Sequence, residues 1–357
     1  MDHERGDMRE LPEEFQNILI MRTDRMGDVL LTTPAIAALR DAFPQASLSL
    51  LVRPQTRDLV ADHPALHEVL VDDRTQTHRG IMGFWKLVRQ LRSKQFDLAI
   101  VFHTKRRTNA LAFLADIPYR LGYRNAKWGF LLTHGLKDHR HLGEKHERDY
   151  CLDVLKPLGI QTENHSLYIS IQAVSEEWAE AWLKEEFLTI QDKIISVHPG
   201  ASDPTKMWPP QYFAAVMNKL SDHLAYPMVL VGEKALQPVA AEILSQTRGR
   251  VIDLTGRTSV SQLVSLIKRS HLLISNDSGP VHVAEALGTP VVAIFTRNEP
   301  GINPERWQPL GEKARVVVAP YAGQRSFASG KIKVPAFLNS ISPDEVLHAV
   351  DSLLGLC

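Results

Sequence analysis

The stretch at residues 271–295 (HLLISNDSGPVHVAEALGTPVVAIF) constrains the fold of this chain more than any other. It begins with a short apolar run, continues through the turn sequence NDSGP into an Ala-rich helical pattern, and ends in a second apolar run. Asp277 or Ser278 can cap the helix, and Pro280 suits its first turn. Gly288 suits the end of the helix, where a left-handed residue is common. A buried strand, a helix and a second buried strand in this order predict a parallel βαβ unit.

The turn in this stretch is also a candidate anion site. A helix N-terminus at the carboxyl end of a parallel strand offers unpaired N–H groups and the positive end of the helix dipole. Gly279 lets a ligand approach the backbone, and His282 lies on the same helical face as Ser278, four residues further on. These features favour a bound phosphate, although the same residue types also serve as plain helix caps in many α/β proteins.

Apolar runs and helical patterns alternate over the whole chain, and the alternation starts afresh near residue 193. In the first half we expect strands at residues 17–22, 47–52, 68–71, 96–102, 117–122 and 131–136, with helices at 29–41, 84–94, 108–115 and 149–158. In the second half we expect further strands at 193–197, 228–231 and 251–254, with helices at 178–187, 211–221, 238–246 and 261–268. A polar junction holds one more expected strand, at 167–171, and a capped helix is expected at 342–354. The pattern predicts an α/β fold with two Rossmann-like domains whose strand ends face a common cleft.

Composition excludes several classes of protein. The 357 residues suit two domains, and the 41 Lys and Arg residues balance the 41 Asp and Glu residues, which argues against a nucleic-acid partner. Cys151 and Cys357 form no disulfide framework or metal-ligand spacing, which fits a reducing cytoplasm. The charged N-terminal sequence lacks the apolar region of a signal peptide, and no apolar run is long enough to cross a bilayer. Peripheral contact with a membrane surface stays open.

Four turns at expected strand ends hold the residues that are candidates for catalysis or ligand binding. They are residues 22–28, 198–206, 231–234 and 276–282. Asp28 suits a general base as well as an ordinary first-turn acid. Lys206 sits in the stiff sequence PTKMWP, which suits a fixed charge on a phosphate, although solvated surface lysines are common. Glu233 follows a strand where an acid can accept hydrogen bonds from a ribose, or can be a plain surface charge. No GxGxxG or Walker-type loop occurs, which disfavours dinucleotide oxidoreductases and P-loop enzymes.

Several of these motifs together resemble one family. The segments RTDRMGDVLLTTPAIAALR, LLVRPQTRDLV, HERDYCLDVLKPLGI, SVHPGAS and SNDSGPVHVAEALGTPVVAIF occur in the order found in the glycosyltransferase family that contains the bacterial lipopolysaccharide heptosyltransferases. The resemblance covers about residues 17–310. It implies a GT-B fold with an acceptor-binding domain at residues 1–170 and a nucleotide-sugar-binding domain at residues 171–335. Within residues 336–357 it implies a C-terminal helix that returns toward the first domain.

The resemblance also implies an activity. It is the inverting transfer of a heptose from ADP-L-glycero-D-manno-heptose to the inner core of lipopolysaccharide, without a metal or other cofactor. The family's catalytic acid corresponds to Asp28. The donor-binding residues correspond to Ser202, Lys206, Glu233, Leu254, Asp277, Ser278, Gly279 and His282.

The implied acceptor is an anionic glycolipid at the inner face of the cytoplasmic membrane. Six basic residues of the first half lie at expected strand ends or adjoining turns and can pair with its phosphates or carboxylates, although each alone also suits a solvated surface charge. They are Arg53, Arg57, Lys105, Arg106, Arg107 and Arg120. Residues 321–339 contain no Cys, whereas related sequences carry several in this part of the chain, and we expect this segment to line the acceptor side.

Other functions suit the same architecture. The enzyme can use another nucleotide sugar or another acceptor. A nucleotide-sugar epimerase would need additional acid–base groups around the sugar and no basic acceptor surface. A binding protein without activity would have no use for Asp28 as a base.

Overall fold

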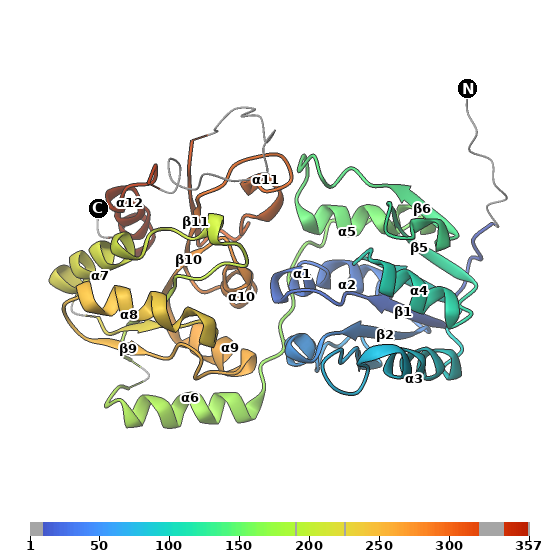
Figure 1. Ribbon diagram of the computed structural model, residues 1–357, viewed down its shortest axis with the longest axis horizontal. Helices are drawn as coiled ribbons and strands as arrows, with labels where there is room; N and C mark the ends of the chain where they lie inside the picture. Colours follow the sequence, from blue (N-terminus) through green and yellow to red (C-terminus); the bar gives the residue numbers. More distant parts are fainter. Residues whose placement is uncertain (1–9, 190, 225, 321–338, 356–357) are drawn as a thin grey trace. The chain divides into compact units, whose positions relative to one another are not determined.

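The computed structural model describes residues 10–189, 191–224, 226–320 and 339–355 of the chain. It divides into two compact units, drawn in Figure 1. Unit 1 comprises Met1–His141 and Glu147–Ser170, and unit 2 comprises Leu142–His146 and Ile171–Cys357. Residues 321–338, which make up nearly all of the expected acceptor-side segment without Cys, lie outside the described residues.

Unit 1 is built on a parallel sheet of six strands in the order β3-β2-β1-β4-β5-β6. The central strands are short apolar runs that are buried on both faces, as in sheets covered by helices on each side. The strands are β1 (Asn17–Met21), β2 (Ser47–Val52), β3 (Glu68–Val71), β4 (Leu98–Val101), β5 (Tyr119–Arg124) and β6 (His134–Lys137). The helices are α1 (Met26–Leu30), α2 (Thr33–Ala42), α3 (Gly80–Ser93), α4 (Arg106–Leu114) and α5 (Glu147–Leu155), with 3-10 turns η1 (Pro54–Leu59), η2 (Gly129–Leu131) and η3 (Lys156–Leu158).

The single helix expected at residues 29–41 is interrupted, and this expectation was wrong. The hydroxyl of Thr32 donates to the carbonyl of Asp28 at 2.8 Å, and that of Thr33 donates to the carbonyl of Leu30 at 2.7 Å. Pro34 has no N–H to continue the helical ladder. The chain therefore ends α1 and restarts as α2, which leaves Asp28 in a short helix of its own.

Unit 2 repeats the same plan with six parallel strands in the order β12-β11-β10-β7-β8-β9. Counted along the chain within each unit, both sheets have the order 3-2-1-4-5-6, which is that of the Rossmann fold. The strands are β7 (Ile194–His198), β8 (Met228–Leu230), β9 (Val251–Asp253), β10 (Ser270–Asn276), β11 (Val291–Phe295) and β12 (Ala314–Val318). The helices are α6 (Ala173–Glu185), α7 (Pro210–Leu224), α8 (Gln237–Gln246), α9 (Val260–Arg269), α10 (Gly279–Leu287), α11 (Pro304–Trp307) and α12 (Pro343–Leu354), with 3-10 turns η4 (Pro204–Lys206) and η5 (Lys234–Leu236).

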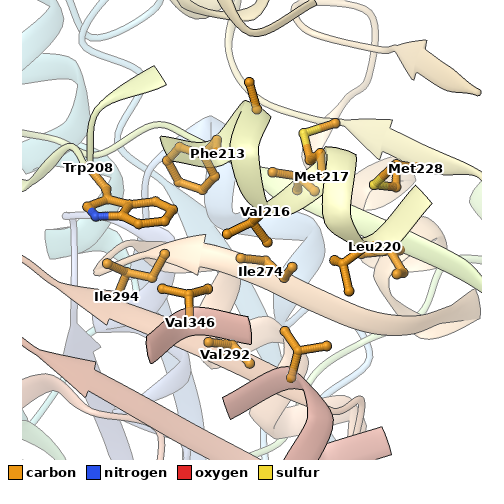
Figure 2. Close-up of a cluster of buried hydrophobic side chains, with 14 of the residues drawn as sticks. Trp208, Phe213, Val216, Met217, Leu220, Met228, Ile274, Val292, Ile294 and Val346 are labelled. Carbon is orange, nitrogen blue, oxygen red and sulfur yellow. The ribbon is translucent and has the colours of Figure 1, made fainter. Parts of the chain in front are cut away.

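One buried cluster joins α7, α8 and α12 to a face of the second sheet, and Figure 2 shows part of it. Trp208 lies at its edge beside Phe213, with 1% of its surface exposed. Its indole N–H donates to the carbonyl of Ile341 at 3.0 Å. The cluster therefore fixes the loop that precedes α7, which carries the candidate Lys206.

Helix α12 belongs to this cluster through Val346 and Val350 and lies against α7, β11 and β12. The C-terminal helix that the resemblance implies within residues 336–357 is α12, and it is part of unit 2. Its apolar face is buried there, and Ser342 caps it with a capping box, as the sequence predicts.

Two further expectations differ from the structure. Residues 167–171 form no strand, because their N–H groups do not pair with a neighbouring strand. The N–H of Tyr168 donates to the hydroxyl of Thr33, and that of Ser170 donates to the carbonyl of Leu59. Strand β12 was missed, since its half-buried sequence ARVVV includes a charged residue. The α/β fold with two Rossmann-like domains is confirmed.

A short segment interrupts the sequence of unit 1 and packs with unit 2. The carbonyl of Gly143 accepts a hydrogen bond from the Asn303 side chain at 3.1 Å, and the ring of His146 lies 2.9 Å from the carbonyl of Gln308. A side chain on Gly143 would meet the backbone of Gly301 at 2.5 Å, so this approach requires glycine.

Within the described ranges, none of the helices combines the length and the apolar character that crossing a membrane would require.

Candidate functional site

Each sheet has a switch point between its two central strands, where ligands of Rossmann-like folds bind beyond the carboxyl ends. In unit 1 it lies between β1 and β4, and in unit 2 between β7 and β10. Thr23 and His103 follow the first pair of strands. His198 and Asn276 end the second pair. The candidate residues are therefore described separately for the two units.

Arg22 is the centre of the switch point of unit 1. It directly follows β1 and is 1% exposed, yet it carries a full charge. Its Nη2 lies 2.8 Å from Asp28 Oδ1 and 2.9 Å from Glu147 Oε1, and its Nε lies 3.2 Å from Asp24 Oδ1. A buried guanidinium needs such partners to offset the loss of hydration. One buried cation thus holds three acidic side chains at the end of β1.

If all three acids of this cluster were ionised, they would outnumber the single positive charge of Arg22. The pKa of Asp24 is raised in this setting. Burial raises the pKa of Asp24 to about 8, with the neighbouring carboxylates Asp28 and Glu147 adding to the shift and Arg22 opposing it. His103 lies 3.8 Å from Asp24, and burial together with nearby cations holds the pKa of its ring well below its ordinary value. Asp24 therefore binds a proton at neutral pH while His103 does not.

Asp28 occupies the first turn of α1, which agrees with the alternative that it is an ordinary first-turn acid. The N-cap position belongs to Arg25, and the carboxylate of Asp28 pairs with Arg22 instead of capping the helix. Its side chain remains 17% exposed, whereas that of Glu147 is 2% exposed. Asp28 is thus the more accessible of these two acids.

Asp72, directly after β3, gathers a second group of charges. It is fully buried and accepts hydrogen bonds from Arg107 at 2.7 and 2.9 Å and from Arg74 at 2.8 Å. These bonds lower its pKa although burial opposes them. Arg74 and Arg53 also donate to the hydroxyl and the carbonyl of Thr23, each at 2.8 Å. Arg53 and Arg107 therefore lie on the same edge of the sheet, as the sequence predicts.

The other expected acceptor residues lie in different settings. Lys105 precedes α4, and the neighbouring ammonium of Lys127, followed by burial, lowers its pKa. Arg106 is exposed on the first turn of the same helix. Arg57 is exposed in η1, 3.4 Å from Asp58. All three side chains are exposed to solvent.

Arg120 does not belong with this group, and the expectation that it does was wrong. It is the second residue of β5, at the amino end of that strand, whereas the other basic residues follow strand carboxyl ends or open helices. Its guanidinium donates to the carbonyls of Leu131, Ile117 and Pro118 and covers the ring of Phe113. The guanidinium of Arg120 therefore serves as a hydrogen-bond donor to backbone carbonyls.

The switch point of unit 2 is built around Asp277 and Lys206. The Lys206 ammonium lies 2.5 Å from Asp277 Oδ2, beside the first turn of α10. Ser278 is the N-cap with an extended backbone, and Gly279 and Pro280 open the helix. Because the first N–H groups of a helix have no partner within it, a cation and free donors lie side by side here.

Hydrogen bonds hold the segments that follow β7 and β10 in place. The side chain of Asn276 accepts from the N–H of Trp208 at 3.0 Å and donates to the carbonyl of Pro199 at 2.7 Å. His198 Nδ1 lies 3.1 Å from the hydroxyl of Ser278, and burial lowers the pKa of this ring to about 4. With Trp208 anchored in the core, as Figure 2 shows, Lys206 projects from a fixed loop.

The remaining donor candidates surround this turn less closely or face elsewhere. Glu233 is exposed where η5 begins, after β8. Leu254 is buried and its N–H donates to the carbonyl of Leu230, so it can offer a ligand only its carbonyl oxygen. Ser202 is exposed in the loop before η4. His282 is buried in α10, 3.3 Å from the Glu285 carboxylate, whose pKa it lowers against the effect of burial.

Sequence reasoning missed Asp24, Asp72, Arg74 and Glu147 as site residues. The first three lie within three residues of a strand end, so the rule that selected Asp28 and Arg53 applies to them too. Glu147 opens α5 and is brought to Arg22 only by the fold. Among the residues that the structure describes, no group of three or more His, Cys, Asp or Glu is placed to hold a metal ion.

Comparisons with known proteins support one family. Its model, glycosyltransferase family 9 (heptosyltransferase), matches residues 84–335. Lipopolysaccharide heptosyltransferase 2 of Escherichia coli K12 is 27% identical over 349 residues, covering 94% of this chain and 98% of that protein. Lipooligosaccharide heptosyltransferase 2 of Haemophilus ducreyi is 24% identical and covers 95% of this chain and 99% of its own length.

Solved structures agree. A family 9 glycosyltransferase from Veillonella parvula superposes with a TM-score of 0.87 at 26% identity, covering 98% of this chain and all of that one. The ADP-heptose lipopolysaccharide heptosyltransferase II of E. coli has the same fold, with a TM-score of 0.76 at 24% identity and coverage of 96% and 99%. Because the family model spans well over half of the sequence, the chain belongs to glycosyltransferase family 9 (heptosyltransferase), and it is a glycosyltransferase.

Proposed function

We propose that this glycosyltransferase transfers a heptose from ADP-L-glycero-D-manno-heptose to the inner core of lipopolysaccharide, with inversion and without a metal. The names of the relatives carry the substrate class, since they include lipopolysaccharide heptosyltransferases 2 and 3. The residues of unit 2 carry the donor side. The supporting observation is the Lys206 ammonium held beside the first turn of α10, at the switch point of a Rossmann-like sheet.

The donor diphosphate would bind at this turn. Lys206 and the N–H groups of Ser278 and Gly279 offer positive charge where negative charge grows as ADP departs. Asp277 holds the ammonium in place. His282 lies four residues after Ser278 and therefore on the same side of α10. Glu233 would accept hydrogen bonds from the ribose, while Ser202 and the carbonyl oxygen of Leu254 would complete the nucleotide site.

The acceptor would bind to unit 1. Arg53, Arg57, Lys105, Arg106 and Arg107 provide cations at or near the carboxyl edge of its sheet, and such cations suit phosphate and carboxylate groups. Asp28 would take the proton from the acceptor hydroxyl. The hydroxyl oxygen then forms the new bond to the anomeric carbon, the bond from that carbon to the diphosphate oxygen breaks, and ADP leaves with the electron pair.

The test is a transfer assay with the purified full-length chain. ADP-heptose and a heptose-deficient core acceptor are incubated with the chain in the presence of a chelator. The expected result is a mass gain of one heptose on the acceptor with stoichiometric release of ADP. Calorimetric titration with ADP, UDP and GDP, without and with Mg²⁺, identifies the nucleotide.

The outcomes separate the alternatives. A preference for UDP or GDP would keep the transferase and overturn the ADP-heptose donor. A change of donor configuration without transfer would indicate an epimerase, and nucleotide binding without any reaction would indicate a binding protein.

A further inference from the structure

The first two turns of α3 expose large apolar side chains next to one another. Ile81 is 79% exposed, Met82 is 87% exposed and Trp85 is 44% exposed. Single apolar residues on a surface are common, but three within five residues form a patch that marks a contact with a partner. None of them is used by the site described above.

The rest of the same helical surface is basic. Lys86 and Arg89 are exposed on α3, and Arg92 is exposed and pairs with Asp116. The sequence of α3, GIMGFWKLVRQLRS, contains no acidic residue. Residues on the opposite side of the helix, such as Leu87 and Leu91, are buried against the sheet. Helix α3 therefore combines a buried inner face with an outer face that is apolar at its start and basic beyond it.

The apolar patch is fixed near the basic edge of unit 1. Phe84, between the exposed residues, lies under the guanidinium of Arg107 at 5.1 Å. Arg107 in turn bonds Asp72 at the end of β3 and the carbonyl of His78. A side chain on Gly83 would come within 2.4 Å of the His78 backbone, so the first turn of α3 is tightly seated. Figure 1 shows α3 beside α4 on the outside of this sheet.

We propose that Ile81, Met82 and Trp85, together with Lys86 and Arg89, form a docking surface for an anionic lipid membrane. Apolar and Trp side chains enter the boundary between headgroups and acyl chains, while Lys and Arg bind the negative headgroups. The inference rests on the proposed function for its purpose, because a glycolipid acceptor lies in a membrane. It names the surface by which unit 1 reaches that membrane.

Charge selects the lipid over a second copy of the chain. A symmetric dimer through this face would bring together two surfaces that are both positively charged, since each copy contributes Lys86 and Arg89 and no acidic residue of α3. Like charges brought together in this way are repelled. An anionic surface instead complements both parts of the patch.

Sedimentation with vesicles tests the proposal on the full-length chain. We expect binding to vesicles of phosphatidylglycerol and phosphatidylethanolamine, and much weaker binding to phosphatidylcholine. Ile81→Ser with Met82→Ser should reduce partitioning about tenfold or more on the anionic vesicles. Lys86→Gln with Arg89→Gln should also reduce it by about tenfold, an effect that high salt mimics. Val174→Ser, which replaces an apolar residue of α6 that is 77% exposed, is the matched control and should change nothing.

A second measurement needs no destabilising change. Brominated lipid in the anionic vesicles should quench part of the Trp fluorescence, and Trp85→Phe should abolish that part. Equal vesicle binding by wild type and both double variants, or quenching that survives Trp85→Phe, would overturn the proposal. So would a lipid-free dimer, seen by sedimentation velocity, that the Ile81→Ser/Met82→Ser variant abolishes.

The outcome is separable from the transferase proposal. Transfer to a soluble core oligosaccharide without lipid reports on the catalytic site alone. If that transfer succeeds while vesicle binding fails, the docking surface is wrong and the function stands. If vesicle binding depends on α3 while no transfer occurs with any acceptor, the proposed function is wrong and the surface stands.

Discussion

The two sheets have the same strand order but present different chemistry at their switch points. In unit 1, a buried Arg22 holds three acidic side chains, and further arginines surround Asp72. In unit 2, one lysine and a helix N-terminus stand among small polar groups. The first arrangement suits a proton acceptor and an anionic sugar, and the second suits a diphosphate. Shared topology therefore sets where ligands bind, while the residues after each strand set what is bound.

The sharpest way to test this division of roles is to remove the proposed base. Asp28→Asn keeps the size of the side chain and removes its basicity, so turnover should fall on the order of 10³-fold. ADP affinity, which we assign to unit 2, should stay unchanged in calorimetry. Asp41→Asn, on an exposed position of α2, is the control. Near-normal turnover in Asp28→Asn would remove Asp28 from the chemistry.

The next largest effect concerns stability. Arg22→Met leaves Asp28 and Glu147 without their buried cation, which should cost about 3 kcal/mol in the free energy of unfolding by urea. Arg57→Met removes an exposed ion pair and should cost less than about 1 kcal/mol. Adding Glu147→Gln to Arg22→Met should restore part of the loss. Equal costs for both arginines would mean that the carboxylate cluster does not depend on its cation.

A smaller effect is expected in the donor site. Lys206→Ala removes one charge-assisted contact to the diphosphate and should weaken ADP binding roughly 30-fold, since such a contact contributes about 2 kcal/mol. Lys219→Ala, which removes an exposed lysine paired with Asp344, should leave the affinity unchanged. If Lys206→Ala bound ADP as tightly as wild type, the phosphate site would lie elsewhere.

The smallest expected effect is a pH dependence of the free energy of unfolding, which arises from Asp24 in unit 1. The pKa of Asp24 is raised to about 8, so between about pH 4 and 8 the folded chain binds a proton that the unfolded chain releases. This contribution to stability is therefore lost as pH rises, by about 1 kcal/mol between pH 6 and 7. Urea unfolding of wild type and Asp24→Asn at both pH values should show the loss only in wild type. Parallel behaviour of the two proteins would mean that Asp24 is ionised when folded.

The fold was predictable from sequence where strands are buried on both faces. The bounds of β2 and β11 follow from largely apolar runs between turn residues. Edge strand β12 was not predicted, because it is half-buried and its sequence mixes apolar residues with a charged one. The break between α1 and α2 escaped because the hydroxyls of Thr32 and Thr33 bond back to the helix, which no periodicity reveals.

The site was predictable in part, for a related reason. Residues that follow strands share an edge of the sheet, so Arg53, Arg107 and the turn at Asp277 could be selected by position alone. The pairing of Arg22 with Glu147 joins residues 125 positions apart and needs the fold. Arg120 also sits at a strand end, but at the amino end, and its use by backbone carbonyls is visible only in three dimensions.

The segment Leu142–His146 has a consequence for the order of events during synthesis. It leaves the ribosome between two parts of unit 1, but its partners Gly301, Asn303 and Gln308 are made more than 150 residues later. Unit 1 can gather its own strands and α5 in the meantime, with this segment as an open loop. The contacts of Gly143 and His146 therefore form among the last, when unit 2 is nearly complete.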